Sequence, residues 1–390
     1  MLEGVRVVEL GVWVAGPAAG GLLADWGADV IKVESPVGDP FRRMLQVTGG
    51  ARGDIASPPF DLDNRGKRSV VLDLRTDEGR DAMHRLLATA DVFLTNLRPE
   101  AVDELGLGAE AVRAAHPRLI YASVTGYGRT GPDAHRAGYD VGGFWARSGL
   151  ASMAVPPGEP QPHFRGGVGD HVTALSALAG VLGALLERER TGVGALVEVS
   201  LLRSGIYCFG WDLSMELRWG KLGASQPRSE QGNPMINVYQ ARDGAWFWLL
   251  GVEADRMWPK LLAAIGHEGW ADDERWRSTR DRRYNAVSLI AELDALFATK
   301  DRDDWTAIFD QHDVWWAPVN TPPEVARDPQ AIAAGAFVEV PDGAGAPAHR
   351  GVAGPVTFDG RPAVIRPVPA LGEHTEEVMA ELRESAPPEP

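Results

Sequence analysis

The sequence is poor in cysteine and in positive charge. Its 390 residues include one cysteine, Cys208, which excludes an intrachain disulfide and any multi-cysteine zinc or iron–sulfur site. The 39 lysines and arginines are outnumbered by 54 acidic residues, giving a net charge of −15. Nucleic-acid binding usually needs a basic surface, so we expect no nucleic-acid partner. A reducing cytoplasm fits this cysteine usage best.

Long apolar runs and common catalytic motifs are also missing. The longest nearly apolar stretch, residues 174–186, is shorter than the roughly 18 residues of a membrane helix, and no signal-peptide pattern follows Met1. The nine histidines show no zinc-ligand spacing, and no Gly-x-Ser-x-Gly motif occurs. We therefore expect a cytoplasmic protein without a membrane partner and without a metal. Cys208 has aromatic neighbours, which predicts an inert core thiol.

What the chain does contain is a regular alternation of strand and helix patterns. Such an alternation is typical of a doubly wound α/β domain with a mostly parallel sheet. Pro17 suits the first position of the first helix, and Gly27 suits its C-terminal end. The predicted strands are residues 5–10, 28–34, 69–74, 91–95, 119–124 and 195–200, and the predicted helices are 17–26, 77–88, 99–115 and 170–190.

The pattern changes after about residue 225. A predicted hairpin over residues 237–252 is followed by helices rich in Arg, Asp and Trp, and then by a Gly- and Pro-rich segment that ends in a short helix. We predict a large domain over residues 1–200, a linker over 201–225, a small α+β domain over 226–325, and a return segment over 326–390 that completes the large domain.

One carboxylate stands out. Gly166-Gly-Val-Gly-Asp170 places a loop with three glycines directly before the long predicted helix. Aspartate is a favoured N-cap, so Asp170 need have no other purpose. However, the glycines let a ligand approach the backbone, and a helix N-terminus favours the ionised form that a nucleophile needs. From these residues alone, capping and catalysis are equally supported.

Other polar groups are expected near strand ends, where doubly wound sheets bind ligands. Asp140 and Tyr139 follow the loop after the strand at 119–124. Tyr139 suits either a hydrogen-bond donor or a core aromatic. Basic residues within 63–68, together with Arg75 and Arg98, suggest a shared anionic-ligand pocket, although each one singly suits a solvated position.

Several segments together resemble the class III CoA-transferases, a family that includes formyl-CoA transferase, carnitine CoA-transferase and α-methylacyl-CoA racemases. The matches run in order from the first residues to the tail. They are Leu2-Glu-Gly-Val-Arg-Val-Val-Glu-Leu10, Ala15-Gly-Pro17, Leu23-Ala-Asp-Trp-Gly-Ala-Asp-Val-Ile-Lys-Val-Glu34, Asn64-Arg-Gly-Lys-Arg-Ser69, Asn96-Leu-Arg-Pro99, Gly126-Tyr-Gly128, Gly169-Asp170, Arg190-Thr-Gly192 and Leu371-Gly-Glu-His-Thr375.

The resemblance implies a Rossmann-like large domain, a small domain and an interlocked homodimer. It also implies transfer of coenzyme A from an acyl-CoA thioester to a carboxylic acid. In such enzymes an aspartate attacks the thioester, forming an aspartyl anhydride and then an aspartyl-CoA thioester. Gly169 and Asp170 match the motif that carries this nucleophile, which favours catalysis over capping at Asp170. Tyr139 and Asp140 are the further candidate catalytic residues.

The resemblance also carries over contacts for CoA, and two positions depart from the family pattern. Ser35 stands where family members often have an arginine, so we expect Arg42 or Arg43 to supply that charge, and Glu104 stands where some members have another arginine. The matching contact residues are Val14, Ala15, Leu72, Asp73, Leu74, Arg75, Asn96, Leu97, Arg98, Arg136, Ala137, Gly138 and Tyr139.

Two alternatives to CoA transfer remain. The first is an acyl-CoA racemase without a covalent intermediate, indicated by the acids Asp140 and Glu253. Glu253 suits an acid/base helper in either branch or a solvated position. In the racemase branch a histidine occupies the position of Tyr139. A tyrosine, with an ordinary pKa of about 10, shuttles protons poorly at neutral pH, which favours transfer. The second alternative is a catalytically silent CoA-binding dimer. Trp13, Trp145, Trp246 and Trp248 suggest a bulky or apolar acyl pocket, or ordinary core positions.

Overall fold

The computed structural model describes residues 1–44, 57–343, 347–361 and 363–384. The chain forms two compact units. The first consists of Met1–Ser152, Pro162–Leu222 and Ala333–Pro390, and the second of Met153–Gln161 and Gly223–Ile332. The segment predicted as a linker, residues 201–225, contains two helices that belong to the first unit, α9 (Leu201–Cys208) and α10 (Gly210–Trp219).

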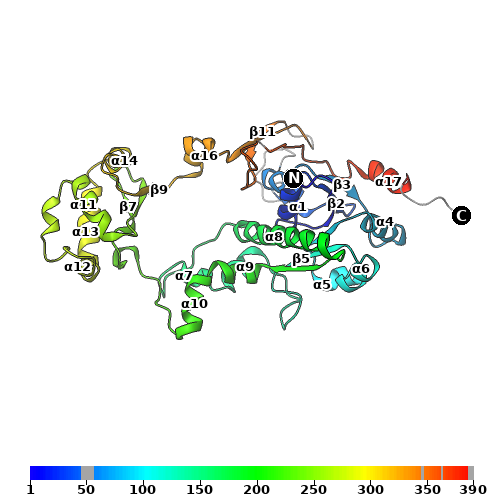
Figure 1. Ribbon diagram of the computed structural model, residues 1–390, viewed down its shortest axis with the longest axis horizontal. Coiled ribbons are helices and arrows are strands. Elements are labelled where there is room, and N and C mark those ends of the chain that lie inside the picture. The colour runs from blue at the N-terminus through cyan, green and yellow to red at the C-terminus, as the bar shows by residue number, and fades with distance from the viewer. Residues whose placement is uncertain (45–56, 344–346, 362, 385–390) are drawn as a thin grey trace. The chain divides into compact units, whose positions relative to one another are not determined.

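A six-stranded parallel sheet forms the centre of the first unit (Figure 1). Its spatial order is β3-β2-β1-β4-β5-β6, so the chain direction across the sheet reverses between β1 and β4. The predicted parallel sheet is confirmed. Its strands are β1 (Arg6–Leu10), β2 (Asp29–Glu34), β3 (Arg68–Val71), β4 (Val92–Thr95), β5 (Ile120–Thr125) and β6 (Leu196–Ser200).

Helices cover both faces of this sheet because its strands are apolar on both sides. Val7 and Val30 face one helical layer, made of α1 (Ala15–Asp25) and α8 (Val168–Thr191). Val8 and Ile31, the next residues along, face the other layer. That second layer contains α4 (Asp77–Ala88), α5 (Pro99–Glu104), α6 (Ala109–Ala115) and α17 (Thr375–Glu384). Burial of both faces explains the continuous apolar runs of the strands.

Two predicted helices differ in detail from the structure. The predicted helix at 99–115 is two helices, because Gly106 adopts φ +73° and interrupts the hydrogen bonding. The first helix begins at Ala15, two residues before Pro17. Proline is tolerated there because the backbone N–H groups of a first helical turn have no partner within the helix.

Helix α8 is long and apolar enough to cross a membrane by length and composition alone. One side of α8 packs on the sheet, where Ala174, Ala177, Leu178 and Val181 are buried. Small side chains permit this close approach. A Cβ at Gly180 would lie 2.5 Å from Val197 of β6.

The remaining elements of the first unit surround the sheet. A π-helical segment, η2, packs on α9, and β10 pairs with β11 in an antiparallel hairpin. The C-terminal helix α17 reaches back to the sheet, where Val378 and Leu382 are buried beside α4. These elements are η1 (Pro40–Arg43), α3 (Pro58–Asn64), η2 (Val141–Ala146), α7 (Leu150–Met153), β10 (Phe337–Val340) and β11 (His349–Val352).

The second unit is a small α+β body with its own aromatic core around Tyr239, Phe247, Phe297 and Phe309. The predicted hairpin is confirmed as β7 (Ile236–Gln240) and β8 (Trp246–Leu250), joined by β9 (Trp316–Pro318). Its helices are η3 (Arg228–Glu230), α11 (Ala254–Ile265), η4 (Glu268–Ala271), α12 (Thr279–Tyr284), α13 (Ala286–Phe297), α14 (Arg302–Gln311), α15 (Pro322–Val325) and α16 (Pro329–Ala333), the last ending one residue beyond the unit.

Candidate active site

A cavity of about 290 Å³ opens at the carboxyl edge of the sheet, where β1 and β4 lie side by side. The loops that leave these two strands diverge at this point, and doubly wound sheets bind ligands in the resulting crevice. Asp170, in the first turn of α8, also lines it. The other lining residues are Val12, Trp13, Val14, Ala15, Asn96, Leu97, Arg98, Pro99, Ala101, Val124, Thr125, Gly126, Ala134, Arg136, Ala137, Gly138, Tyr139 and Leu201.

Asn96 ties the two diverging loops together. Its side-chain Oδ1 accepts a hydrogen bond from the Val12 backbone N–H (2.9 Å), and its Nδ2 donates to the Val12 carbonyl (2.7 Å). Gly16 makes room for it, because a Cβ there would lie 2.9 Å from the Asn96 Cγ. The amide of Asn96, expected from the resemblance to contact CoA, is therefore already engaged in holding the cavity wall.

Trp13 occupies a strained position in that wall. Its φ of +65° is a left-handed conformation that tryptophan rarely adopts. The Asp39 carboxylate accepts a hydrogen bond from the Trp13 backbone N–H (3.1 Å) and also pairs with the buried Lys32 (3.0 Å). Trp13 thereby presents its indole to Tyr139, with the ring centres 6.3 Å apart and nearly perpendicular. Nothing in the sequence indicated this conformation.

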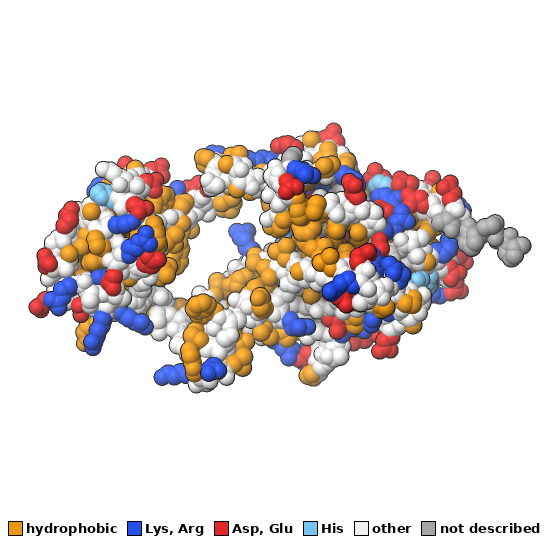
Figure 2. Space-filling view, viewed as in Figure 1, with side chains coloured by type: hydrophobic (Ala, Val, Ile, Leu, Met, Phe, Trp, Pro, Cys, Tyr) orange, Lys and Arg blue, Asp and Glu red, His pale blue; other side chains and the backbone are white. Residues whose placement is uncertain are grey.

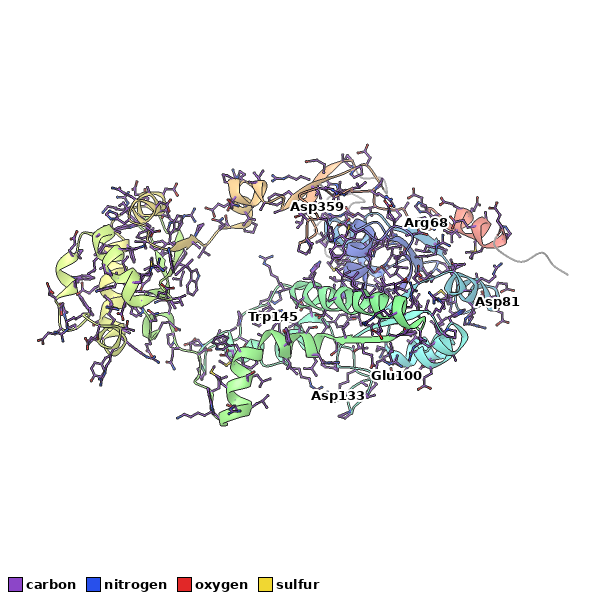
Figure 3. The ribbon with its side chains drawn as sticks, viewed as in Figure 1. Arg68, Asp81, Glu100, Asp133, Trp145 and Asp359 are labelled. Atoms are coloured by element: carbon purple, nitrogen blue, oxygen red, sulfur yellow. The ribbon has the colours of Figure 1, made fainter. Side chains whose placement is uncertain are left out.

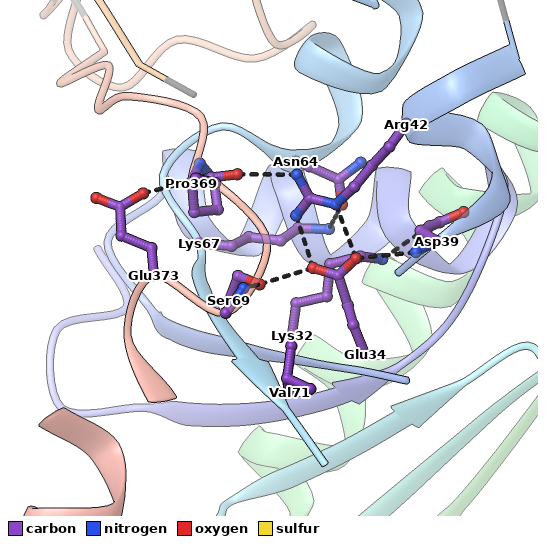
Figure 4. A network of polar contacts seen from close by, with 12 residues as sticks. Lys32, Glu34, Asp39, Arg42, Asn64, Lys67, Ser69, Val71, Pro369 and Glu373 are labelled. Carbon is purple, nitrogen blue, oxygen red and sulfur yellow. Dashed lines mark hydrogen bonds and ion pairs between the residues drawn. The ribbon is translucent and has the colours of Figure 1, made fainter. Parts of the chain in front are cut away.

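Lys32, Asp39 and Lys67 belong to a buried network of charges in the first unit (Figure 4). Lys32 donates to Glu9 and to the Gly11 carbonyl, and Lys67 pairs with the other oxygen of Glu9 at 2.7 Å. The two lysines lower the pKa of Glu9 against the effect of its burial, while burial lowers the pKa of Lys67 to about 8. Fully buried ion pairs of this kind fix geometry, since removing one partner leaves an uncompensated charge.

Asp170 does not cap its helix. The N-cap is Gly167, at φ +92°, which has no side chain to offer. Asp140 accepts the hydrogen bond instead: its Oδ1 receives the backbone N–H of Gly169 (3.0 Å). The carboxylate of Asp170 has no hydrogen bond or ion pair within the part of the chain that the structure describes, and Asp170 lines the cavity.

Gly169 is required by the packing around it. A Cβ at this position would lie 2.2 Å from the Phe144 Cγ and 2.3 Å from the Asp140 Oδ1. Both atoms sit close to their own backbones and have little freedom to move. The absence of a side chain therefore lets η2 and α8 approach until Asp140 reaches the helix end.

Burial and neighbouring charge make Asp170 an unusually basic carboxylate. Burial raises its pKa to about 7, Asp140 and Asp63 add to the rise, and His171 opposes it. Burial also raises the pKa of Asp140, whose Oδ2 is enclosed without a hydrogen-bond partner among the described residues. A carboxylate with an elevated pKa is a stronger nucleophile and base than one in water.

Tyr139 is an exposed residue at the cavity rather than a core aromatic; 64% of its surface is accessible. Loop 126–138 holds it through close backbone contact, because a Cβ at Gly126 would lie 2.5 Å from the Cα of Gly138. Trp145 lies in η2, beside α9 (Figure 3), and stacks on Phe164 with ring centres 4.2 Å apart. Trp246 and Trp248 belong to β8 of the second unit.

The structure brings most of the predicted site residues to one cavity, but not all. Leu72, Asp73, Leu74 and Arg75 follow β3, two strands from β1 in the sheet, and do not line it. There the exposed Arg75 pairs with Asp73 at 2.7 Å. Gly169 and Asp140 lie behind Asp170 and support it. The predicted residues that line the cavity are Val14, Ala15, Asn96, Leu97, Arg98, Arg136, Ala137, Gly138, Tyr139 and Asp170.

The expectation that the basic residues within 63–68 gather an anionic ligand is wrong. Arg65 is buried against Asp25 (2.6 Å), Lys67 against Glu9, and Arg68 bridges Asp29 and Glu381.

Arg42, expected to replace a missing family arginine, is similarly occupied. It pairs with Glu34 at 2.6 Å and donates to the Pro369 carbonyl. These side chains hold β2, β3 and the C-terminal segment together, so they serve the fold.

Two other expectations concern residues outside the cavity. Cys208 is exposed on α9, so its prediction as a core thiol is wrong; the outer side of α9 has no cover within the chain that the structure describes. Burial nevertheless raises the pKa of its thiol, which opposes reactivity. Glu253 is the exposed residue preceding α11 in the second unit, and it pairs with Arg256 at 2.9 Å.

One side chain beside Asp170, His171, was not expected at the site. His171 contacts Asp63 and the Gly167 carbonyl. A histidine directly after the candidate nucleophile was visible in the sequence, but Asp63 is 108 residues away, so the pairing was not.

Comparison with known proteins agrees with these features. Residues 2–375 match the model of CoA-transferase family III. The chain is 35% identical to cinnamoyl-CoA:phenyllactate CoA-transferase of Clostridium sporogenes, covering 85% of this chain and 81% of that enzyme. It is 34% identical to succinate–glutarate CoA-transferase of Agrobacterium fabrum, covering 98% and 95%. A solved CAIB/BAIF family protein from Brucella suis matches with a TM-score of 0.85 at 32% identity, covering 97% of this chain and 98% of that chain.

Proposed function

Because this chain belongs to CoA-transferase family III, we propose that it moves CoA from an acyl-CoA donor to a carboxylic acid acceptor, with Asp170 as the nucleophile. The observation that carries the proposal is that two carboxylates, Asp140 and Asp170, have different positions at the start of α8. Asp140 accepts the hydrogen bond at the end of α8, and the Asp170 carboxylate, which lines the cavity, has no hydrogen-bond partner among the described residues. A carboxylate that served only to cap would lie where Asp140 lies.

In the proposed first step, an ionised Asp170 oxygen attacks the thioester carbonyl. The C–S bond breaks, CoA leaves as its thiolate, and an acyl–aspartyl anhydride remains. The thiolate then attacks the aspartyl carbonyl, which releases the donor acid and leaves an aspartyl-CoA thioester. The acceptor carboxylate attacks this thioester, which breaks its C–S bond, releases the CoA thiolate again and forms a second anhydride between the acceptor and Asp170. The thiolate then attacks the acceptor carbonyl of this anhydride, which gives the acceptor acyl-CoA. Asp170 is regenerated, and no oxidant or proton source is consumed.

The local environment supports this chemistry. A partly desolvated carboxylate of raised pKa reacts more readily than one in water, provided that it is held in position. Gly169 supplies the close approach that holds it, and α8 is anchored on the sheet. The phenol of Tyr139 lies at the same cavity as a hydrogen-bond donor for the reacting carboxyl groups.

We further propose that CoA enters over the loops after β1 and β4, so that its thioester reaches Asp170. The lining residues Val14, Ala15, Leu97, Arg98 and Arg136 support this route. Arg98 and Arg136 are exposed and cationic, which suits a pyrophosphate. The segment after β3 suits contact with the adenosine end of CoA. It consists of Leu72, Asp73, Leu74 and Arg75.

We also propose a Rossmann-like first unit in a cytoplasmic, interlocked homodimer. The strand order supports the fold assignment. The exposed apolar face of α9 and α10 supports self-association: Tyr207 and Trp211 are 87% and 84% accessible, and Figure 2 shows apolar side chains gathered along α10. Monomers rarely leave large aromatic patches uncovered.

The proposed function is tested by replacing the nucleophile. Asp170→Ala and Asp170→Asn should abolish exchange of CoA between acids, by a factor of 10³ or more, because no covalent intermediate can form. Mass spectrometry after mixing the unmodified enzyme with acyl-CoA and hydroxylamine should locate the trapped adduct at residue 170.

Two controls complete this test. Glu253 does not line the cavity, so Glu253→Gln should retain full exchange of CoA between acids. Incubation of a 2-methylacyl-CoA in deuterated water should give no α-exchange in the absence of an acceptor acid. Undiminished exchange of CoA in folded Asp170→Ala would disprove the proposal, and acceptor-independent α-deuteration would favour a racemase.

A further inference from the structure

His171 lies next to the proposed nucleophile and makes two contacts with its imidazole ring. Nε2 lies 3.0 Å from the Asp63 Oδ1, and Nδ1 lies 2.6 Å from the Gly167 carbonyl oxygen. The same carbonyl also accepts the His171 backbone N–H at 2.9 Å. The ring is therefore held at both ends, by α3 on one side and by the N-cap of its own helix on the other.

Both of these partners are hydrogen-bond acceptors. A carbonyl oxygen and an ionised carboxylate cannot donate, so each ring nitrogen must carry a proton for both contacts to be hydrogen bonds. A neutral imidazole would turn a lone pair toward one of the two oxygens. The geometry thus fits an imidazolium cation, although the first turn of a helix disfavours positive charge. The almost fully buried Asp63 is the group that offsets this.

We propose that His171 is a positioning residue of the site: an imidazolium, clamped between Asp63 and the Gly167 carbonyl, that fixes the first turn of α8 and keeps the neighbouring Asp170 ionised. The proposal rests on the proposed role of Asp170 as nucleophile. His171 itself touches no substrate in this scheme. It acts through the position and the charge state of Asp170.

The charges around the site explain why such a cation is needed. Asp170 is influenced by two other carboxylates, Asp140 from the segment before η2 and Asp63 from α3. Both disfavour a third negative charge, and burial disfavours it further. His171 is the group that lowers the pKa of Asp170. Without it, the nucleophile would be protonated over more of the neutral range.

The charge of His171 depends in turn on Asp63. The hydrogen bond and the charge of Asp63 raise the pKa of His171 to about 8, so the cation persists through neutral pH and is lost above it. Burial raises the pKa of Asp63, while His171 and Lys67 lower it and Glu9 raises it. Asp170 ionises above about pH 7. The ionised nucleophile and the cation therefore coexist near neutral pH.

The decisive experiment measures the charge states of Asp170 and His171 directly, without substrate. In the full-length protein labelled with ¹³C at aspartate carboxyls and ¹⁵N at histidines, NMR titration gives both midpoints, with Asp170→Asn for assignment. We expect both ring nitrogens of His171 to be protonated at pH 7. In His171→Gln, which keeps a hydrogen-bonding side chain without the charge, the Asp170 midpoint should rise by about one pH unit.

Activity provides a second readout. The acid limb of the kcat/KM profile should move upward with the Asp170 midpoint, and raising the pH should restore His171→Gln. The KM for the CoA thioester should change less than twofold. Asp63→Asn should lower the titration midpoint of His171 from about pH 8, because Asp63 is the group that raises it. His84→Gln, at an exposed histidine of α4, is the matched control and should alter neither midpoint.

The inference fails if His171 is neutral at pH 7, or if the Asp170 midpoint is the same in folded His171→Gln as in the unmodified protein. A loss of activity that no pH restores, with an unmoved midpoint, would indicate a structural role and also overturn it. Because the NMR midpoints need no turnover, they stay readable if Asp170→Ala retains exchange. That result would remove the proposed function and leave the electrostatic coupling measured.

Discussion

At the scale of single residues, the structure separates two roles that one aspartate can play. A carboxylate at a helix N-terminus either receives backbone N–H groups or remains free to react. Here Asp140 receives the Gly169 N–H, and Asp170 lines the cavity without a hydrogen-bond partner among the described residues. Gly169 allows Asp140 to accept this N–H in place of Asp170, since any side chain at position 169 would displace Asp140. Reactivity at position 170 thus depends on two neighbours that need not touch substrate.

This arrangement has a cost in stability that can be measured. The pKa of Asp170 is about 7 in the folded protein against 3.8 ordinarily. Below pH 3.8 the carboxyl is protonated in both states and contributes nothing. Between pH 3.8 and 7 the unfolded state ionises first, so stability falls, and above pH 7 the full cost remains. We expect Asp170→Asn to raise the free energy of unfolding by about 1–2 kcal/mol at pH 8.

Denaturant unfolding at pH 8 and at pH 4 provides the measurement. The gain should shrink at pH 4, where the carboxyl in the folded protein is already neutral. Glu253→Gln, at the exposed residue directly before α11, should leave the free energy of unfolding unchanged at both pH values. A destabilised Asp170→Asn at pH 8 would contradict the assigned burial and charge.

At the scale of elements, α8 places the site because it is held along its middle and at its first turn. Its middle packs on β5 and β6 through small and branched side chains, while Asp140 and His171 fix its first turn. The loops after β1 and β4 are fixed in the same way, by Asn96 and by the buried network of Glu9, Lys32, Asp39 and Lys67. Precise placement of reacting groups requires such support.

Two glycines on α8 provide a matched test of this packing. We expect Gly169→Ala to destabilise the protein by about 3 kcal/mol or more, because the new methyl would overlap Phe144 and Asp140. Gly183→Ala should instead stabilise it by about 0.5–1 kcal/mol, since Gly183 is exposed with open space around it, and alanine is the better helix former.

Thermal and denaturant unfolding of both variants measures these effects, and exchange of CoA should fall sharply in Gly169→Ala alone. Equal stability changes in the two variants would show that the close approach of η2 to α8 is not needed.

At the scale of the whole molecule, each unit has its own core. The sheet of the first unit is covered by helices on both faces, and an aromatic cluster fills the second. The outer face of α9 and α10 is not covered by the part of the chain that the structure describes, and Tyr207, Trp211, Leu217 and Trp219 are largely exposed there. Such a surface in a chain of net charge −15 fits permanent contact with an apolar partner surface.

We therefore expect the protein to be a dimer in solution. Light scattering coupled to size exclusion should give twice the mass of one chain down to nanomolar concentration, because the proposed interlocked arrangement cannot separate without unfolding. A Tyr207→Ser, Trp211→Ser double variant should yield less folded protein. Arg75→Ser, Asp73→Ser, on an exposed pair of the first unit, is its control. A monodisperse monomer would contradict the proposed assembly.

The sequence by itself determined the alternation of strands and helices, the hairpin of the second unit and the family. These depend on local periodicity, turn residues and short motifs that lie together along the chain. It also predicted that Asp170 and the loops after β1, β4 and β5 belong to the site, since the carboxyl ends of parallel strands lie at one edge of a sheet. It did not determine which charged side chains would be free.

Only the tertiary structure decided that. Arg42, Arg65, Lys67 and Arg68 are held in ion pairs with residues distant in sequence, and His171 meets Asp63 across 108 residues. Charge pairing depends on distances of a few ångströms between segments, which periodicity does not specify. Long-range packing therefore settled which groups hold the fold and which face the cavity.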